Sequence, residues 1–319
     1  MLFRRIRRWW HLRDPEVRWV VEVGVKEVPE EASPVPEVLP HPYEFISRYV
    51  TENSYLLDDP HTVLGILRGS EADKPLRYTL KLKGLGGIRL FLSRPEIVAD
   101  PYLVLMESDD LSLWLLTYHG VVTAARLELV DGRVLYGLRV FTEYLRGFEG
   151  EVSVAATRLR KSFYDWGPEF SVYIKGLDRQ HNYLVTTLNN LYRHLIAGSS
   201  REVIDDTLSA LVDYTKFHFR SEEILFDKYG YPRAEGHRKQ HKSFVDKVAE
   251  FMEEYKAGEQ RLSVEVLNFL ADWVYNHILI SDHDYGEWFL EKHLPIVEEE
   301  LAKESREARR KLGLDKRLE

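Results

Sequence analysis

Hydrophobic residues follow two different patterns in the two halves of the chain. From Arg18 to about Tyr144 they form short runs rich in β-branched and aromatic residues, separated by turn residues. This is the pattern of β-strands. From about Gly176 onward they recur at intervals of three and four residues over long stretches, which is the pattern of amphipathic helices. The sequence therefore predicts an α+β region followed by an all-α region.

The first half predicts an antiparallel sheet, because its strand-like runs follow one another with short connections. Asp131 and Gly132 lie between two runs and are typical of a tight hairpin turn, whose central residues need positive φ. We interpret GLGG at 84–87 as a turn between two strands, because a phosphate-binding loop would lead into a helix. The predicted strands are 18–25, 76–83, 88–93, 102–107, 111–118, 121–130 and 133–141.

Two helical stretches are also predicted in the first half. One spans about 43–67, with a break near 58–60, and the other spans about 152–163. The order of a strand, helices, antiparallel strands and a final helix resembles the helix-grip, START-like folds that bind ligands. This resemblance rests on element order alone. It implies a small hydrophobic ligand or a protein as the partner of the first domain.

The second half contains four long amphipathic segments, at 179–197, 201–229, 234–257 and 261–289. Short breaks separate them, and short loops join antiparallel neighbours, so we expect an up-down four-helix bundle. A charged helix at about 295–311 follows, whose runs of like charge are typical of a solvated face. The expected fold is a two-domain α+β chain: an antiparallel-sheet α+β domain at 1–165, the bundle at 166–290, and a charged C-terminal helix or tail at 291–319.

Composition removes several classes of function. The 319 residues include no cysteine, which excludes disulfides, thiolate metal sites and cysteine nucleophiles. A formal net charge of -8 makes a nucleic-acid partner unexpected. No apolar run approaches the roughly 18 residues of a membrane span, and the basic start of the sequence lacks the apolar core of a signal peptide. We expect a cytoplasmic protein whose metal ligands could only be histidine and carboxylate.

Histidines and carboxylates recur at ligand spacing in the helical half. His218 and Glu222 are four residues apart, as are His237 and His241, and residues at this interval project from one side of a helix. One such pair arises by chance on many helices, but here all four predicted helices contribute. The seven candidates are His181, His218, Glu222, His237, His241, His277 and Asp282. Five imidazoles and two carboxylates suit iron better than calcium or magnesium.

The spacing of His277 and Asp282 is unusual for two ligands of one site. Residues five apart on an ideal α-helix point about 140° away from each other. We therefore expect a local wide turn, or a looser helix, at this place. Seven ligands are too many for one ion, and two octahedral ions bridged by carboxylates would use them.

The segment from about Trp166 to Tyr285 resembles the hemerythrin family in its bacterial and archaeal form. The resemblance is carried by LDRQH at 177–181, HFRSEEILFDKYGYP at 218–232, HRKQH at 237–241 and LNFLADWVYNHILISDHDY at 267–285. The intervals between ligands also fit. His181 and His218 are 37 residues apart, Glu222 and His237 are 15 apart, and His277 and Asp282 are 5 apart.

The resemblance implies two iron ions in a di-iron-oxo centre that binds dioxygen reversibly. His237, His241 and His277 would hold one iron, His181 and His218 would hold the other, and Glu222 and Asp282 would bridge them. The residues that match the oxygen pocket of the family are Leu184, Phe219, Trp273, Val274 and Ile278. No catalytic residue is predicted. Oxygen sensing, storage or delivery, coupled to the first domain, is the function expected.

Two other classes of function stay open. The centre could act as an enzyme that reduces peroxide or nitric oxide, or that oxidises a substrate held by the first domain. It could also be an iron-sensing or structural metal bundle. Oxidative di-iron enzymes in bundles carry more carboxylates, so the histidine-rich set favours reversible binding over catalysis. We expect Glu223 to be solvated and His194, His283 and His293 to lie at the surface or at helix ends, although His283 could support its neighbour Asp282.

Overall fold

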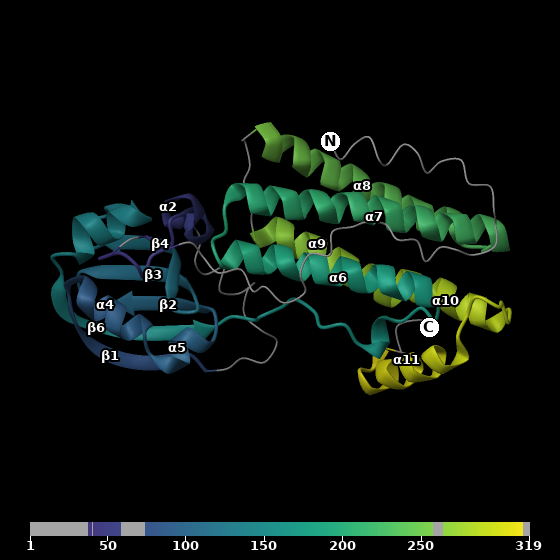
Figure 1. Cartoon of the computed structure of the whole chain (residues 1–319), viewed down its shortest axis with the longest axis horizontal. Coiled ribbons are helices and arrows are strands. Elements are labelled where there is room, and N and C mark those ends of the chain that lie inside the picture. The colour runs from purple at the N-terminus through teal and green to yellow at the C-terminus, as the bar shows by residue number, and fades with distance from the viewer. Residues whose placement is uncertain (1–37, 40, 59–73, 258–263, 315–319) are drawn as a thin grey trace. The chain divides into compact units, whose positions relative to one another are not determined.

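The computed structural model describes residues 38–39, 41–58, 74–257 and 264–314 (Figure 1). The strand predicted at 18–25 and the later part of the helix predicted at 43–67 lie outside these ranges. Within them, an N-terminal α+β domain built on one sheet is followed by a bundle of long helices (Figure 1). The two-domain α+β architecture expected from the sequence is confirmed.

All pairings in the sheet are antiparallel, and the strand order is β1-β6-β2-β3-β4-β5. Gly132 has a φ of 84° in the turn between β4 and β5, so the predicted hairpin is confirmed. The bounds are β1 Leu76–Lys83, β2 Tyr102–Glu107, β3 Leu111–Tyr118, β4 Val121–Leu129, β5 Val134–Tyr136 and β6 Glu149–Arg158.

The strand predicted at 88–93 is wrong. This segment belongs to helix α4, Gly84–Leu92, which is followed by α5, Pro95–Ala99. Ile88, Phe91 and Leu92 are buried while Leu90 is 73% exposed, which is a helical spacing that a short apolar run conceals. GLGG is therefore the first turn of a helix, and the interpretation of this motif as a turn between strands is also wrong.

The helix predicted at 152–163 is wrong as well. Residues 149–158 form β6, which pairs with β1 on one side and β2 on the other. Its buried residues include Val152, Val154 and Ala156, and alternation of this kind belongs to a strand. The resemblance to helix-grip folds depended on a final helix at 152–163, and most of these residues belong to a strand instead.

Two further elements of the first domain differ from their predicted bounds among the described residues. In the segment 133–141 only β5 is extended, and it is followed by a π-helix, η2, Val140–Leu145. The helix predicted from residue 43 begins later, as α2, Val50–Asn53, and η1, Ser54–Leu57. Helices α4 and α5 contribute Ile88, Phe91 and Ile97 to one hydrophobic cluster with strand residues such as Val104 and Leu113.

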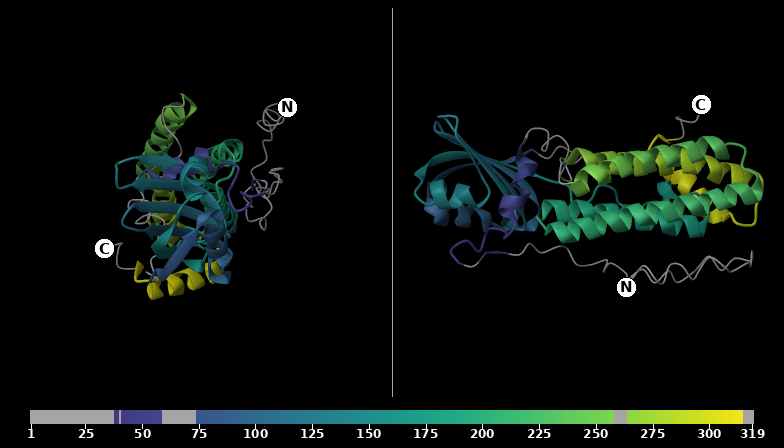
Figure 2. Two further views of the ribbon diagram at one scale, coloured as in Figure 1. Left: turned by 90° about the vertical axis from the view of Figure 1, so that its left-hand side faces the viewer. Right: turned by 90° about the horizontal axis from the view of Figure 1, so that it is seen from above.

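The four predicted bundle helices are confirmed. They are α6 Lys175–Ile196, α7 Arg201–Tyr229, α8 Ala234–Ala257 and a last helix made of α9 Val264–Asn276, the π-helix η4 His277–Asp282 and α10 His283–Glu291. The helices run side by side (Figure 2). Ser200 accepts a hydrogen bond from Val203 N and caps the start of α7, and Gly230 ends this helix in the left-handed conformation, as helix signals predict.

Helix α11, Glu299–Lys311, follows the bundle and packs against the 3-10 turn η3, Pro168–Phe170. It begins four residues later than predicted. The charged runs of this helix were expected to form a solvated face. Glu299 and Glu300 are exposed, but Arg309 is buried together with Ala302 and Ser305. No helix among the described residues is long and apolar enough to cross a membrane.

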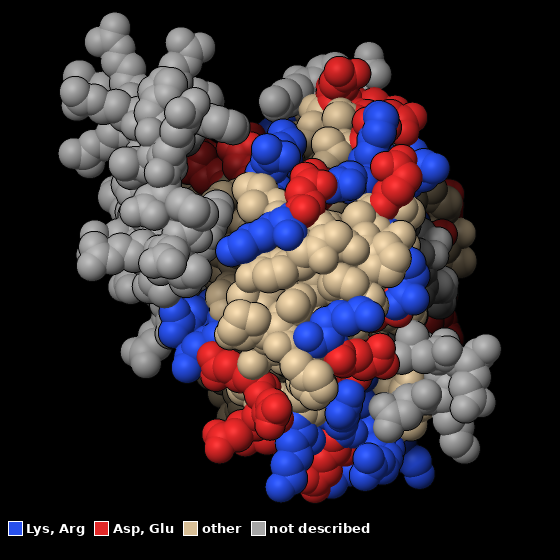
Figure 3. Space-filling view, turned by 90° about the vertical axis from the view of Figure 1, so that its right-hand side faces the viewer, with Lys and Arg blue, Asp and Glu red and all other residues tan. Residues whose placement is uncertain are grey.

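An aromatic cluster lies where α10 and the end of α7 meet, and Phe226, Tyr231, Tyr285 and Phe289 belong to it. Seen from this end of the bundle, Lys, Arg, Asp and Glu side chains surround a face of uncharged residues (Figure 3). The cluster joins α10, which follows Asp282, to the end of α7, which follows Glu222. It therefore supports the helices that carry both carboxylates.

Candidate metal centre

All seven candidate ligands meet inside the bundle. Each is at most 5% exposed, and Glu222, His181 and Asp282 are fully buried. Ligand atoms of four residues lie within 4.8 Å of one another in each of two groups, which share Glu222. One group is His181, His218, Glu222 and Asp282, and the other is Glu222, His237, His241 and His277.

The π-helix η4 brings His277 and Asp282 to the same site. Its hydrogen bonds span five residues, as from His283 N–H to Ile278 O, so that residues five apart come nearly above one another. His277 Nε2 lies 3.1 Å from Asp282 Oδ1. The wide turn expected from the spacing is confirmed.

The two carboxylates lie between the two histidine groups. Glu222 Oε1 is 3.2 Å from His218 Nε2, whereas Glu222 Oε2 is 3.1 Å from His241 Nε2. Asp282 repeats the arrangement: Oδ2 is 3.2 Å from His181 Nε2, and Oδ1 is 3.2 Å from His237 Nε2. Each carboxylate thus presents one oxygen to each side, which is the disposition that bridging of two cations requires.

Electrostatics favour cations at this place. Burial opposes a charge on Glu222, but His218 and its histidine neighbours hold the pKa of this carboxyl well below its usual value. Burial also lowers the pKa of His181 and His237, yet the carboxylates of Asp282 and Glu222 beside them raise these pKa values to about 9 and about 10. The buried carboxylates therefore require positive charge, which protons on these rings or metal ions can supply.

The donor set fits metal ions better than it fits internal hydrogen bonding. Both ring nitrogens of His181 and both carboxylate oxygens of Asp282 are buried without a hydrogen-bond partner among the described residues. Leaving such groups unpaired is costly. Metal bonds to His181 Nε2 and to the two Asp282 oxygens would remove most of this cost.

Neighbouring side chains orient two of the imidazoles. His218 Nδ1 lies 3.0 Å from Gln180 Oε1, and His241 Nδ1 lies 3.2 Å from Glu223 Oε1. An acceptor at Nδ1 places the ring proton there and leaves the Nε2 lone pair free for a metal. Glu223 was expected to be solvated, and this is wrong: its side chain is 24% exposed and faces a predicted ligand.

Tyr285 is a functional residue that the sequence analysis missed. Its hydroxyl donates to Glu222 Oε1 at 2.7 Å, and its ring is fully buried. Burial, followed by the nearby charges of Glu222 and Asp282, raises its pKa well above the usual value, so the hydroxyl keeps its proton and remains a donor. Tyr285 stands three residues after Asp282, on the same helix face, which was the available signal.

Two of the predicted pocket residues lie directly against ligand rings. Phe219 stacks on His241 with ring centroids 3.7 Å apart, and Trp273 stacks on His277 at 4.2 Å. Both contacts are on the three-histidine side. The other three predicted pocket residues, Leu184, Val274 and Ile278, are buried, at 2–3% exposure.

The three remaining histidines of this half have different surroundings. His283 was expected at the surface or at a helix end; it is the first residue of α10 but is buried, so a place at the surface is wrong. Its Nε2 lies 2.5 Å from Tyr173 Oη. Burial lowers the pKa of His283 to about 4, so the ring is neutral near pH 7. His194 lies in the last turn of α6, and His293 lies in the exposed turn after α10, as expected.

These features define a class of protein: a helical bundle with a histidine-rich site for two bridged metal ions. A family model described as "Hemerythrin HHE cation binding domain" matches residues 172–289. Bacteriohemerythrin of Stenotrophomonas maltophilia is 33% identical over 124 residues, which are 38% of this chain and 78% of that protein. The chain belongs to the hemerythrin family. This family binds a di-iron centre, and the two clusters described above could hold its ions.

Other relatives cover a similar share of the chain. Bacteriohemerythrin of Methylococcus capsulatus is 33% identical over 37% of this chain and 89% of its own length. Myohemerythrin-1 of Phascolopsis gouldii is 26% identical over 38% of this chain and 91% of its own length. The solved structure entitled "Crystal structure of hemerythrin:wild-type" is 32% identical and covers 39% of this chain and 95% of that chain, with a TM-score of 0.37.

Proposed function

We propose that the bundle binds dioxygen reversibly at a di-iron centre. His237, His241 and His277 hold one iron, and His181 and His218 hold the other. Glu222 and Asp282 bridge the two ions. The observation that carries the proposal is the opposed placement of the carboxylate oxygens, since each carboxylate has one oxygen near each histidine group.

The unequal number of histidines supports binding of a small ligand. One group has three imidazoles and the other has two, while each carboxylate has one oxygen near each group. The side with two imidazoles therefore offers one donor fewer, which leaves room for dioxygen. A pair of ferrous ions, when bound, supplies the electrons that reversible dioxygen binding needs.

The protein's own residues would keep this reaction reversible. Trp273 stacks on His277, and Phe219 stacks on His241. The Phe219 ring also lies 5.9 Å, between centroids, from His218 on the side with two imidazoles, and an apolar, dry site disfavours the charge separation that would release reduced oxygen. Tyr285 holds Glu222 in its bridging orientation by donating to Oε1. Together these groups exclude water and fix a carboxylate without taking part in electron transfer.

Reconstitution of the full chain with ferrous iron under argon tests the proposal. We expect two irons per chain by elemental analysis. We also expect absorption bands that appear in air and fade on return to argon, with one dioxygen taken up per two irons in an oxygen electrode. One zinc per chain as the native metal, or bands that never fade, would contradict reversible binding.

A di-iron enzyme is the competing outcome of the same experiment. Continuous consumption of peroxide or nitric oxide by the reduced protein, at a rate above that of free ferrous iron, would assign the centre to catalysis. If the metal content does not depend on the redox state, and the protein neither takes up oxygen nor turns over a substrate, the centre has an iron-sensing or structural role.

We also propose that the N-terminal domain, at 1–165, responds to oxygenation of the bundle at 166–290, in cytoplasmic oxygen sensing, storage or delivery. The observation behind this proposal is the fusion itself, because the family segment begins at residue 172 and a six-stranded sheet precedes it. Its partner would be a small hydrophobic ligand or a protein. Hydrogen exchange of β3 and β4 amides should differ between air and argon. Equal exchange in both states would overturn the coupling.

A further inference from the structure

A side chain from helix α11 binds the main chain of the ligand-bearing π-helix. Leu279 lies inside η4, where the hydrogen-bond pattern departs from that of an α-helix. Arg309 Nη2 donates to Leu279 O at 2.8 Å, and Arg309 Nη1 donates to Glu169 O at 3.3 Å. Arg309 is only 2% exposed, and arginine is seldom buried this far unless its donors are used. Arg309 therefore links α11 to the main chain of η4 and to that of η3.

A second chain of contacts leads from α11 to the residue after Asp282. Arg306 donates from Nε to Glu287 Oε1 at 3.0 Å, and its Nη2 pairs with Oε2, so the pair is bidentate. Glu287 in turn accepts from the Tyr173 hydroxyl. Tyr173 Oη is the atom that lies 2.5 Å from His283 Nε2. Through these contacts α11 holds both ends of the segment that surrounds Asp282.

A third set of contacts fixes the chain that enters α6, the helix carrying His181. Ser305 Oγ donates to Ser171 O at 3.2 Å, and Ser171 Oγ donates to Asp178 Oδ2 at 2.6 Å. Tyr173 has a φ of 68°, which is uncommon and strained for a large side chain. Its carbonyl accepts from Glu298 N at 2.9 Å, just before α11 begins. This hydrogen bond from the residue before α11 thus stabilises the positive φ of Tyr173.

We propose that α11 is a positioning element of the metal centre and that Arg309 is its principal positioning residue. By binding Leu279 O, Arg309 fixes the width of η4 and so the separation of His277 and Asp282. This inference rests on the proposed metal centre but goes beyond it, because α11 lies outside the family segment 172–289.

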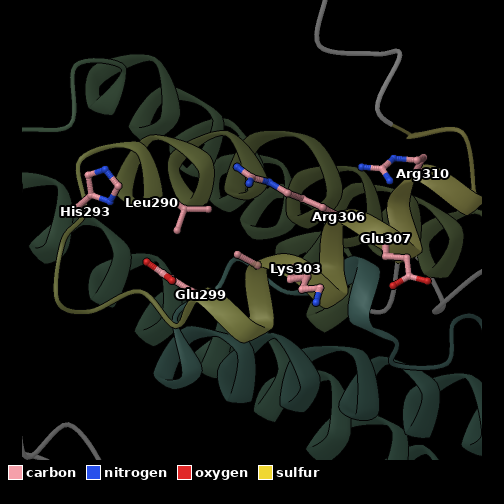
Figure 4. Close-up of a pocket in the computed structure, with 8 residues that line it drawn as sticks. Leu290, His293, Glu299, Lys303, Arg306, Glu307 and Arg310 are labelled. Atoms are coloured by element: carbon pink, nitrogen blue, oxygen red, sulfur yellow. The ribbon is translucent and has the colours of Figure 1, made fainter.

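The pocket between the end of α10 and α11 makes Arg306 a useful second test position. It has a volume of about 610 Å³ and is lined by Leu290, His293, Glu299, Ala302, Lys303, Arg306, Glu307 and Arg310 (Figure 4). The Arg306 side chain is 47% exposed. A substitution there weakens the contact to Glu287 without opening a buried cavity, so the variant should fold.

The test compares four full-length variants. Arg309→Met keeps much of the side-chain volume and removes the donors, and Arg309→Lys restores a charge and one set of donors. Arg306→Met interrupts the second chain of contacts. Arg310→Met makes the same change at an exposed neighbouring arginine and is the matched control. Circular dichroism and thermal unfolding establish that each variant is folded.

We expect Arg309→Met to release iron to a chelator about 10- to 100-fold faster than the native chain, as for residues that support metal ligands. Its iron absorption spectrum should shift, Arg309→Lys should recover part of both effects, and Arg310→Met should match the native chain. Arg306→Met should show a smaller increase in release.

Hydrogen exchange of residues 277–283 in the metal-free protein separates this inference from the function. We expect faster exchange there in Arg309→Met than in Arg310→Met. If Arg309→Met matches the native chain in its rate of iron release, its absorption spectrum and its hydrogen exchange, the positioning role is wrong. Failure of the native chain to bind two irons would overturn the proposed function, while the exchange result would still decide whether Arg309 holds η4.

Discussion

Tyr285 donates a hydrogen bond of 2.7 Å to Glu222 Oε1, the oxygen that also lies 3.2 Å from His218 Nε2. This oxygen thus has an orienting partner besides its predicted ion. Tyr285→Phe removes the donor and leaves the ring in place. We expect metal affinity to fall about 10- to 100-fold, measured by competition with a chelator. Tyr229→Phe, in the same bundle, should leave affinity unchanged, and equal losses in both variants would count against an orienting role.

Asp282→Asn tests whether this carboxylate bridges two ions. The substitution preserves shape but removes the charge and replaces one acceptor oxygen by a donor. We expect fewer than two irons per chain by elemental analysis and loss of the reversible absorption bands. Asp284→Asn is the control, because Asp284 binds Arg233 and Tyr231 at the bundle surface. Two irons per chain in Asp282→Asn would show that another residue bridges the ions.

Phe219→Ala opens the apolar cover over His241. A buried phenylalanine replaced by alanine costs about 3 to 5 kcal/mol of stability, and the cavity would admit water to the ligand rings. We therefore expect a lower unfolding temperature and a faster irreversible oxidation of the oxygenated protein, followed by absorption. Phe217→Ala, at a position 40% exposed, should change neither property much. Unaltered oxidation in Phe219→Ala would show that Phe219 does not protect the centre.

The metal-free protein should lose stability between about pH 6.5 and pH 10. The folded-state pKa values of His181 and His237 are raised to about 9 and about 10, above the unfolded value of about 6.5. Protonated rings therefore stabilise the fold fully below pH 6.5, and this contribution disappears as the pH rises through 9 and 10. His218 and His277 have lowered pKa values, so they are neutral in the folded state over this range and, above about pH 7.5, in the unfolded state as well.

Thermal unfolding at pH 6.5 and 9.5, with and without iron, measures this effect. We expect the unfolding temperature of the metal-free protein to be lower at pH 9.5 than at pH 6.5. The iron-loaded protein should vary much less, because metal bonds replace the protons. A metal-free protein whose stability is flat or rises over this range would mean that the two rings are not charged at neutral pH.

Prediction from the sequence succeeded where a repeating pattern extends over a long segment. The amphipathic spacing of α6, α7 and α8 continues over four turns or more, which is typical only of a helix. The short breaks between them predicted their antiparallel order. It failed for α4 and β6. These segments are short and largely apolar, and periods of 2 and 3.6 residues cannot be told apart over so few positions.

The sequence by itself determined which residues could be ligands, because the absence of cysteine and the four-residue spacing left histidine and carboxylate on facing helices. It also required a departure from the regular α-helix between His277 and Asp282, because residues five apart on an ideal α-helix point away from each other. Only the tertiary structure decided that Tyr285 and Glu223 contact the site and that Arg309 is buried against Leu279. Such contacts join residues distant along the chain, and they depend on packing that no local pattern encodes.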